Sequence, residues 1–161
     1  MMKFVDTKVV FREVPEEIAL AVNISGCPVK CPGCHSSYLA QDIGEILDTN
    51  SLNALIGDNP GINCISFMGG DADPDYLKSL INWIRKYHPS LKVCWYSGRT
   101  LENAESHGMT DLLDFIKVGP FIDECGPLDS ETTNQRFYQI QHSPEGNVLT
   151  DWTAKFRKRF I

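Results

Sequence analysis

Four short apolar stretches, each followed at once by a loop rich in glycine or proline, constrain the fold of this 161-residue chain most strongly. Near-continuous apolar runs of this length are typical of strands that are buried on both faces of a parallel sheet. Segments with helical spacing or helix-start signals separate them, and this alternation predicts one α/β domain over residues 1–161 with mostly parallel strands. The predicted strands are residues 18–25, 62–68, 91–96, 115–118 and 137–141, and the predicted helices are residues 51–56, 74–88, 101–106 and 152–160.

Ligands of such folds collect at the C-terminal ends of the parallel strands. If the first four strands are parallel, the loops that follow them converge on one edge of the sheet. These loops contain the cysteines of residues 26–34, then Gly69, Gly70 and Asp71, then Ser97 and Gly98, and finally Gly119 and Pro120. We therefore expect the functional site at this edge.

Composition and charge exclude several classes of function. The net charge of −6 gives no broad positive field for binding nucleic acid. No run of about 18 apolar residues is present, so we expect no membrane span, and residues 1–12 lack the apolar core of a secretory signal. We therefore expect a cytosolic protein, in which the six cysteines serve a purpose other than disulfide bonding.

Cys27, Cys31 and Cys34 lie within eight residues of each other. Thiolates are soft ligands that select zinc, copper(I) or iron–sulfur clusters. Three closely spaced thiolates can bind three corners of a [4Fe–4S] cluster and leave the fourth iron open to a small molecule. The alternatives are a zinc site, with His35 or a later cysteine such as Cys64 as fourth ligand, or three thiols that bind nothing.

The Cys-x3-Cys-x2-Cys spacing after a first strand resembles the radical-SAM superfamily. In that superfamily the open iron binds S-adenosylmethionine, whose reductive cleavage gives a 5′-deoxyadenosyl radical. Gly69, Gly70 and Asp71 resemble its Gly-Gly-Glu motif, with Asp in place of Glu, which implies contact with the methionine amino group. Ser97 is a candidate contact for the carboxylate or ribose. The alternatives are a simple turn for the glycines and helix capping for Ser97.

Gly33 before the third cysteine is similar to a narrower group, the activating enzymes of anaerobic ribonucleotide reductase. Residues 114–121 and 133–136 resemble further segments of this group. The resemblance implies that Gly33 and His35, on either side of Cys34, approach the adenine; for His35 the alternative is an exposed loop residue. For Asn134, Gln135 and Arg136 we expect a structural role, in which the polar side chains satisfy backbone groups.

The resemblance implies a compact partial (βα) barrel, open on one side, with a [4Fe–4S] cluster and S-adenosylmethionine as cofactors. The implied reaction abstracts a hydrogen from a backbone glycine of anaerobic ribonucleotide reductase. An external reductant such as a flavodoxin supplies the electron, and no catalytic residue is expected beyond the ligands of the cluster and cofactor. The alternatives are an activator of another glycyl-radical enzyme, a small-molecule radical-SAM enzyme, and a non-catalytic electron-transfer or zinc-binding module.

Two features remain outside this scheme. Cys64 and Cys94 lie inside predicted strands and are expected to be buried and inert, whereas Cys125 lies in a loop. The basic tail of residues 155–159 is expected to be a solvated helix end, with docking to an acidic partner as the weaker hypothesis.

Overall fold

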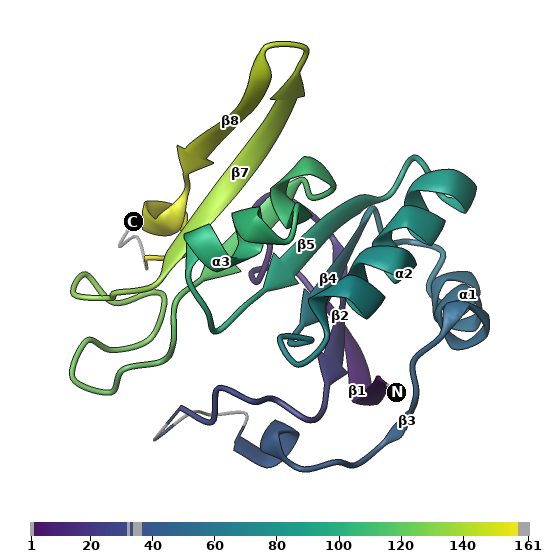
Figure 1. Ribbon diagram of the computed structural model, residues 1–161, viewed down its shortest axis with the longest axis horizontal. Helices are drawn as coiled ribbons and strands as arrows, with labels where there is room; N and C mark the ends of the chain where they lie inside the picture. Colours follow the sequence, from purple (N-terminus) through teal and green to yellow (C-terminus); the bar gives the residue numbers. More distant parts are fainter. Residues whose placement is uncertain (1, 32, 34–36, 158–161) are drawn as a thin grey trace.

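The computed structural model describes residues 2–31, 33 and 37–157. Within these residues one open sheet of eight strands has the order β3-β1-β2-β4-β5-β6-β7-β8 (Figure 1). The strands are β1 (Lys3–Val10), β2 (Ala19–Ile24), β3 (Glu45–Ile46), β4 (Cys64–Met68), β5 (Lys92–Tyr96), β6 (Phe115–Val118), β7 (Arg136–Ser143) and β8 (Gly146–Asp151). The helices are α1 (Thr49–Asp58), α2 (Pro74–Tyr87) and α3 (Leu101–Ser106), with short 3-10 helices η1 (Ser37–Ala40), η2 (Met109–Asp111) and η3 (Thr153–Phe156).

Four parallel strands, β2, β4, β5 and β6, form the centre of the sheet. They are the four apolar runs that the sequence predicts as strands, and nearly all of their residues are buried. The flanking strands β1, β3, β7 and β8 pair antiparallel to their neighbours. The parallel centre is therefore extended on both sides by antiparallel edges, and the partial barrel stays a prediction.

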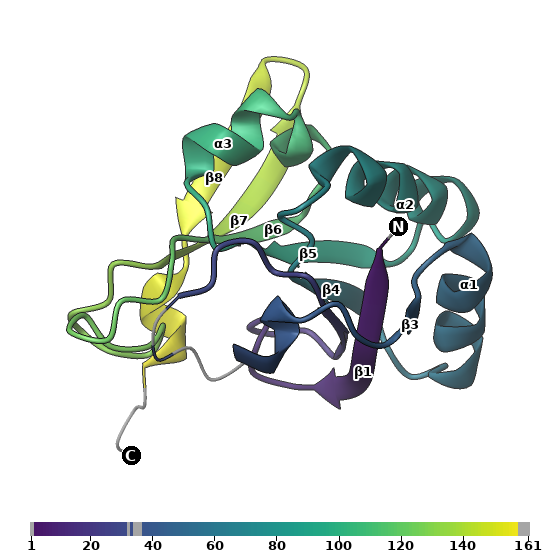
Figure 2. The same ribbon diagram turned by 60° about the horizontal axis from the view of Figure 1, so that its bottom comes forward.

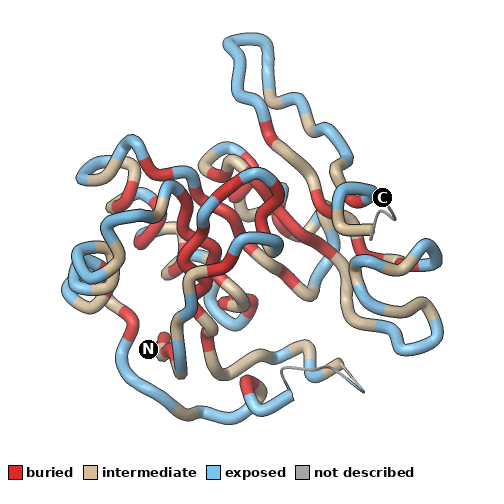
Figure 3. Tube along the Cα trace, turned by 180° about the vertical axis from the view of Figure 1, so that it is seen from behind, coloured by how far each residue is buried: buried red, intermediate tan, exposed pale blue. Residues whose placement is uncertain are grey.

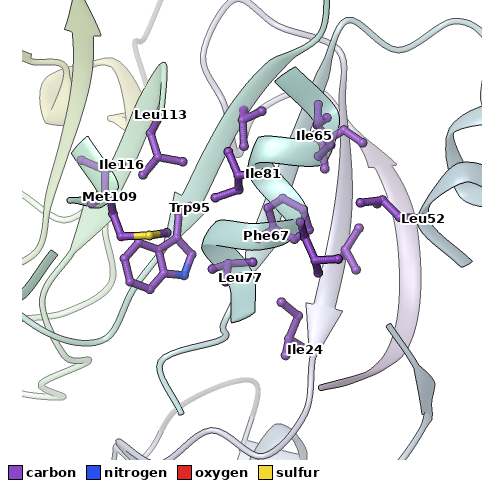
Figure 4. Packing of buried hydrophobic residues seen from close by; sticks show 14 of the residues in the cluster. Ile24, Leu52, Ile65, Phe67, Leu77, Ile81, Trp95, Met109, Leu113 and Ile116 are labelled. Atoms are coloured by element: carbon purple, nitrogen blue, oxygen red, sulfur yellow. The ribbon is translucent and has the colours of Figure 1, made fainter. Parts of the chain in front are cut away.

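The helices pack on one face of the sheet (Figure 2). Leu77 and Ile81 of α2 lie against Phe67 of β4 and Trp95 of β5, all of them buried (Figure 4). The buried residues concentrate along the central strands (Figure 3). Removing this much apolar surface from water is the main favourable term in folding.

The opposite face of the sheet carries a second apolar cluster, which includes Cys64, Cys94, Phe115 and Phe137. Residues 11–17 and the C-terminal segment cover it: Val14 is fully buried there, and Phe156 packs on Phe137 with 5.0 Å between ring centroids. Each face of the sheet thus has its own core. No helix in the described part of the chain is long and apolar enough to cross a membrane.

Several local predictions need correction. Residues 3–10 form β1, an antiparallel strand that is only partly covered: Phe4 and Val10 are buried, whereas Asp6 and Lys8 are exposed. Helix α1 begins earlier than predicted, because Asp48 and Ser51 form a capping box, with the Ser51 amide donating to Asp48 Oδ1 at 2.9 Å.

The terminal helix predicted over residues 152–160 is wrong for the residues that the structure describes. Only a 3-10 turn forms, Thr153–Phe156, and the backbone at Arg157 is extended. Packing of Phe156 on β7 and an ion pair of 2.8 Å between Lys155 and Glu16 hold the segment against the body. Lys155 is therefore not a freely solvated cation. Residues 158 and 159 of the basic tail lie outside the described residues.

Candidate functional site

The loops that follow the four parallel strands meet at one edge of the sheet, as the sequence predicts. Met68 pairs with Tyr96 in neighbouring strands, so the turns after β4 and β5 emerge side by side. The cysteine loop after β2 contacts the loops that follow β5 and β6. A Cβ placed on Gly98 would lie 3.0 Å from Val29 Cγ2, and the Phe121 amide lies 3.3 Å from Cys31 Sγ.

The first half of the cysteine loop is held by backbone hydrogen bonds. The amide of Gly26 donates to Gln41 at 3.0 Å, and the amide of Cys27 donates to Leu39 at 2.8 Å. Lys30 adopts a left-handed backbone conformation, with φ of 50°, which turns the chain between the first two cysteines. The start of the loop is therefore tied to the backbone of η1 and of the residue that follows it.

Cys27 and Cys31 are half-buried free thiols. Cys34 and His35, the third predicted ligand and a predicted adenine contact, lie outside the described residues. Gly33 packs close to the loop after β6: a Cβ there would lie 3.4 Å from Phe121 Cε1. The structure thus places the cysteine loop directly against Phe121 in the loop that follows β6.

Gly69 and Gly70 let the turn after β4 pass close to its neighbours. Their backbone φ angles are 118° and 101°, and residues other than glycine rarely adopt such values. A Cβ on Gly69 would lie 3.1 Å from the Ile24 carbonyl oxygen, and one on Gly70 would lie 3.1 Å from Leu77 Cδ2. The glycines therefore have a structural reason to be here, whatever ligand the turn binds.

Asp71 and Ser97 are both buried and are bonded to each other. The Ser97 hydroxyl donates to Asp71 Oδ1 at 2.5 Å, and the Gly98 amide donates to Asp71 Oδ2 at 2.9 Å. Ser97 does not cap the following helix: the cap of α3 is Thr100, which accepts from Asn103. The two predicted cofactor contacts thus form one hydrogen-bonded unit across the turns.

Lys117 belongs to the same unit and was missed by the sequence argument. Its side chain is 8% exposed, and Nζ donates to the carbonyls of Ser97 at 3.1 Å and Gly119 at 2.8 Å. A buried ammonium and the buried Asp71 carboxylate are therefore linked through Ser97. A lysine inside the apolar run 115–118 was the available signal, because lysine is almost never fully buried without a partner.

The polar segment before β7 satisfies backbone carbonyls, as predicted, and these carbonyls belong to the loop after β6. Asn134 Nδ2 donates to Pro120 at 3.0 Å, and Gln135 Nε2 donates to Gly119 at 3.4 Å. Gln135 is 6% exposed. The segment therefore fixes the loop that contacts Cys31.

A depression of about 480 Å³ lies beside the cysteine loop. Its lining combines apolar side chains with hydroxyl, amide and guanidinium groups. Its lining comprises Pro28, Val29, Gly98, Arg99, Thr100, Asn103 and Pro120. The depression thus joins three of the four strand-end loops.

Cys64 and Cys94 are fully buried, as expected. Burial, as the largest cause, raises the pKa of the Cys94 thiol to about 12 and moves the pKa of Cys64 further upward. Cys64 begins β4, whereas the cysteine loop adjoins the other end of the parallel strands. A strand of this length separates its ends by more than about 10 Å, so Cys64 cannot serve as fourth ligand to the cysteine loop.

A family model described as a 4Fe-4S single cluster domain matches residues 17–143. The chain belongs to this family. The match covers the cysteine loop and runs through all four parallel strands into β7. Neither the comparison with curated proteins nor that with solved structures gave a match.

The donors in this 4Fe-4S single cluster domain fit the cluster that the family implies. Cysteine thiolates are its usual ligands, and the Phe121 amide donates to Cys31 Sγ, as is common for a cluster thiolate. The described residues contain no group of three acidic, histidine or cysteine side chains arranged for another metal site. Family membership therefore favours the iron–sulfur prediction over zinc.

Proposed function

We propose that this 4Fe-4S single cluster domain is a radical-SAM activating enzyme whose protein substrate is anaerobic ribonucleotide reductase. Cys27, Cys31 and Cys34 would hold the cluster. When bound, the cluster and S-adenosylmethionine would supply one-electron reductive cleavage and hydrogen abstraction, with the electron coming from an external reductant such as a flavodoxin and the hydrogen from a backbone glycine of the partner. The expected partial barrel, open on one side, belongs to this proposal.

The unit of Asp71, Ser97 and Lys117 supports the binding of S-adenosylmethionine that the proposal requires. The methionine end of S-adenosylmethionine bears an ammonium and a carboxylate. A buried carboxylate and a buried ammonium, linked through Ser97 at the edge where the cysteine loop lies, match that pair of charges. Each carboxylate oxygen accepts two hydrogen bonds, so Asp71 retains acceptor capacity beyond its two internal donors.

Other residues bring the strand-end loops close together at this edge of the sheet. Gly69 and Gly70 bring backbone close to the end of β2, and Val29 closes the gap to Gly98. The depression beside Val29 lies next to the cysteine loop, at the edge where a substrate would meet the cofactor. Its volume of about 480 Å³ is of the size that small-molecule sites have, so a small-molecule radical-SAM enzyme stays an alternative.

The experiment that tests the activating role mixes the reconstituted protein with the reductase, S-adenosylmethionine and reductant without oxygen. A glycyl radical detected by electron paramagnetic resonance is the expected result. A reductase without radical, in the presence of an intact cluster and cofactor cleavage, would remove this substrate and leave the cleavage chemistry standing. The alternative function to test next would then be activation of another glycyl-radical enzyme.

A further inference from the structure

One peptide group lies between Asn134 and Cys31. Its carbonyl, on Pro120, accepts from Asn134 Nδ2 at 3.0 Å. Its amide, on Phe121, donates to Cys31 Sγ at 3.3 Å. The side chain of Asn134 therefore reaches the sulfur through a single rigid, planar unit.

The direction of the Asn134 amide is fixed by this contact. If the amide were flipped, its oxygen would face the Pro120 carbonyl oxygen, and two acceptors would oppose each other. In the observed orientation Oδ1 is buried and finds no partner among the described residues. A buried unpaired acceptor opposes folding, so stability alone does not explain an asparagine here.

Neighbouring bonds keep the peptide group in place. Gln135 and Lys117 both donate to the carbonyl of Gly119, one residue before Pro120. Two successive carbonyls of the loop are therefore held by side chains. The Phe121 amide is presented to Cys31 with little freedom to turn away.

We propose that Asn134 is a positioning residue for the cluster and that it raises the cluster's reduction potential by setting the hydrogen bond from Phe121 to Cys31. A hydrogen bond accepted at a carbonyl polarises the amide and strengthens donation by its N–H. Donation to a ligand sulfur stabilises the reduced cluster, which carries the additional negative charge. The cluster thus becomes easier to reduce.

This inference depends on the cluster and not on cleavage of S-adenosylmethionine. The test is a redox titration of reconstituted protein without S-adenosylmethionine, followed by electron paramagnetic resonance of the reduced cluster. For Asn134→Ala we expect the ratio of reduced to oxidised cluster at a fixed potential to fall about tenfold, which is 59 mV for one electron. Asn147→Ala is the matched control, because Asn147 also donates one side-chain hydrogen bond, to Asp111 at 2.7 Å, on the remote β7–β8 hairpin.

The control is expected to keep the wild-type potential. Equal potentials for both variants and the wild type would overturn the proposal, since a purely structural asparagine changes stability without moving the potential. Electron–nuclear double resonance of the wild type after exchange into D₂O gives a test that needs no variant. A coupled exchangeable proton is expected from the Phe121 amide, and its absence would also overturn the proposal, even if Asn134→Ala fails to hold a cluster.

Discussion

Asp71 and Ser97 lie on the turns after neighbouring parallel strands and share a hydrogen bond of 2.5 Å, which makes one unit of two separate sequence motifs. The Gly98 amide also donates to Asp71. Lys117, on the neighbouring strand β6, is linked to this unit because its Nζ donates to the Ser97 carbonyl. The turns that are proposed to bind cofactor are thus fixed to one another before any ligand arrives, as preorganised binding requires.

Replacing Asp71 by alanine is expected to destabilise the apoprotein. The Ser97 hydroxyl and the Gly98 amide lose their shared acceptor, and hydrogen bonds to charged groups are worth about 1.5–3 kcal/mol each. The free energy of unfolding, measured in urea, should fall by at least about 2 kcal/mol. Asp75→Ala is the control, because the Asp75 side chain on α2 is 87% exposed; an equal loss in both variants would contradict the account.

Two glycine substitutions should have effects of opposite sign. Gly69→Ala forces a side chain into a backbone with φ of 118° and against the Ile24 carbonyl, so we expect a loss of about 1–3 kcal/mol of stability. Gly57→Ala, in α1 with open space around its Cβ position, should gain about 0.5–1 kcal/mol. Thermal unfolding of both variants measures the difference, and a stabilised Gly69→Ala would contradict the left-handed conformation of Gly69 and its close approach to Ile24.

The buried thiols make stability depend on alkaline pH. Burial raises the pKa of Cys94 from 9.0 to about 12, so above the unfolded-state pKa the unfolded chain loses a proton that the folded chain keeps. The contribution of Cys94 to the free energy of unfolding is fully present below about pH 8, and it declines as the pH rises from about 9 towards 12. The pKa of Cys64 is shifted in the same direction.

Urea unfolding of the reduced apoprotein at about pH 8 and about pH 10 measures this decline, which is expected to be about 1.4 kcal/mol per pH unit for each such thiol. Cys94→Ala should show a shallower decline than the wild type. An identical pH profile would mean that Cys94 is not buried in the apoprotein.

Lys117→Met is expected to weaken binding of S-adenosylmethionine by about tenfold or more, because a desolvated ammonium beside the proposed carboxylate position is lost. Lys78→Met is the matched control, since Lys78 also donates to a backbone carbonyl, that of His107 at 3.1 Å, on the helical face of the sheet. Anaerobic titration calorimetry on cluster-loaded protein gives both affinities. An affinity unchanged by Lys117→Met would place the methionine carboxylate elsewhere.

The parallel centre of the fold could be predicted because its strands are almost wholly apolar and each ends at a glycine or proline loop. Helix α2 was predictable from Asp73 as cap and Pro74 at the first turn. β1 and β8 were not predicted, because their polar residues face solvent at or near an edge and resemble loop sequence. The local sequence pattern cannot distinguish such a strand from a loop, because the segment becomes a strand only by pairing with a neighbouring strand.

For the site, sequence motifs located the residues but not their bonds. The contact between Asp71 and Ser97 depends on the register of β4 and β5, in which Met68 lies opposite Tyr96. The buried ammonium of Lys117 is bonded by the carbonyl of Gly119, two residues later, and by that of Ser97, 20 residues earlier on the neighbouring strand-end loop. Such relationships arise only when the chain has folded.

The proposed radical-SAM activity is best tested by measuring reductive cleavage of S-adenosylmethionine by the reconstituted protein. The protein is loaded anaerobically with iron and sulfide to about four irons per chain, then given S-adenosylmethionine and dithionite, and 5′-deoxyadenosine and methionine are quantified. Both products are expected from the wild type and neither from Cys31→Ser. A wild-type protein that holds a full cluster and forms no 5′-deoxyadenosine would overturn the proposed activity and leave an electron-transfer domain.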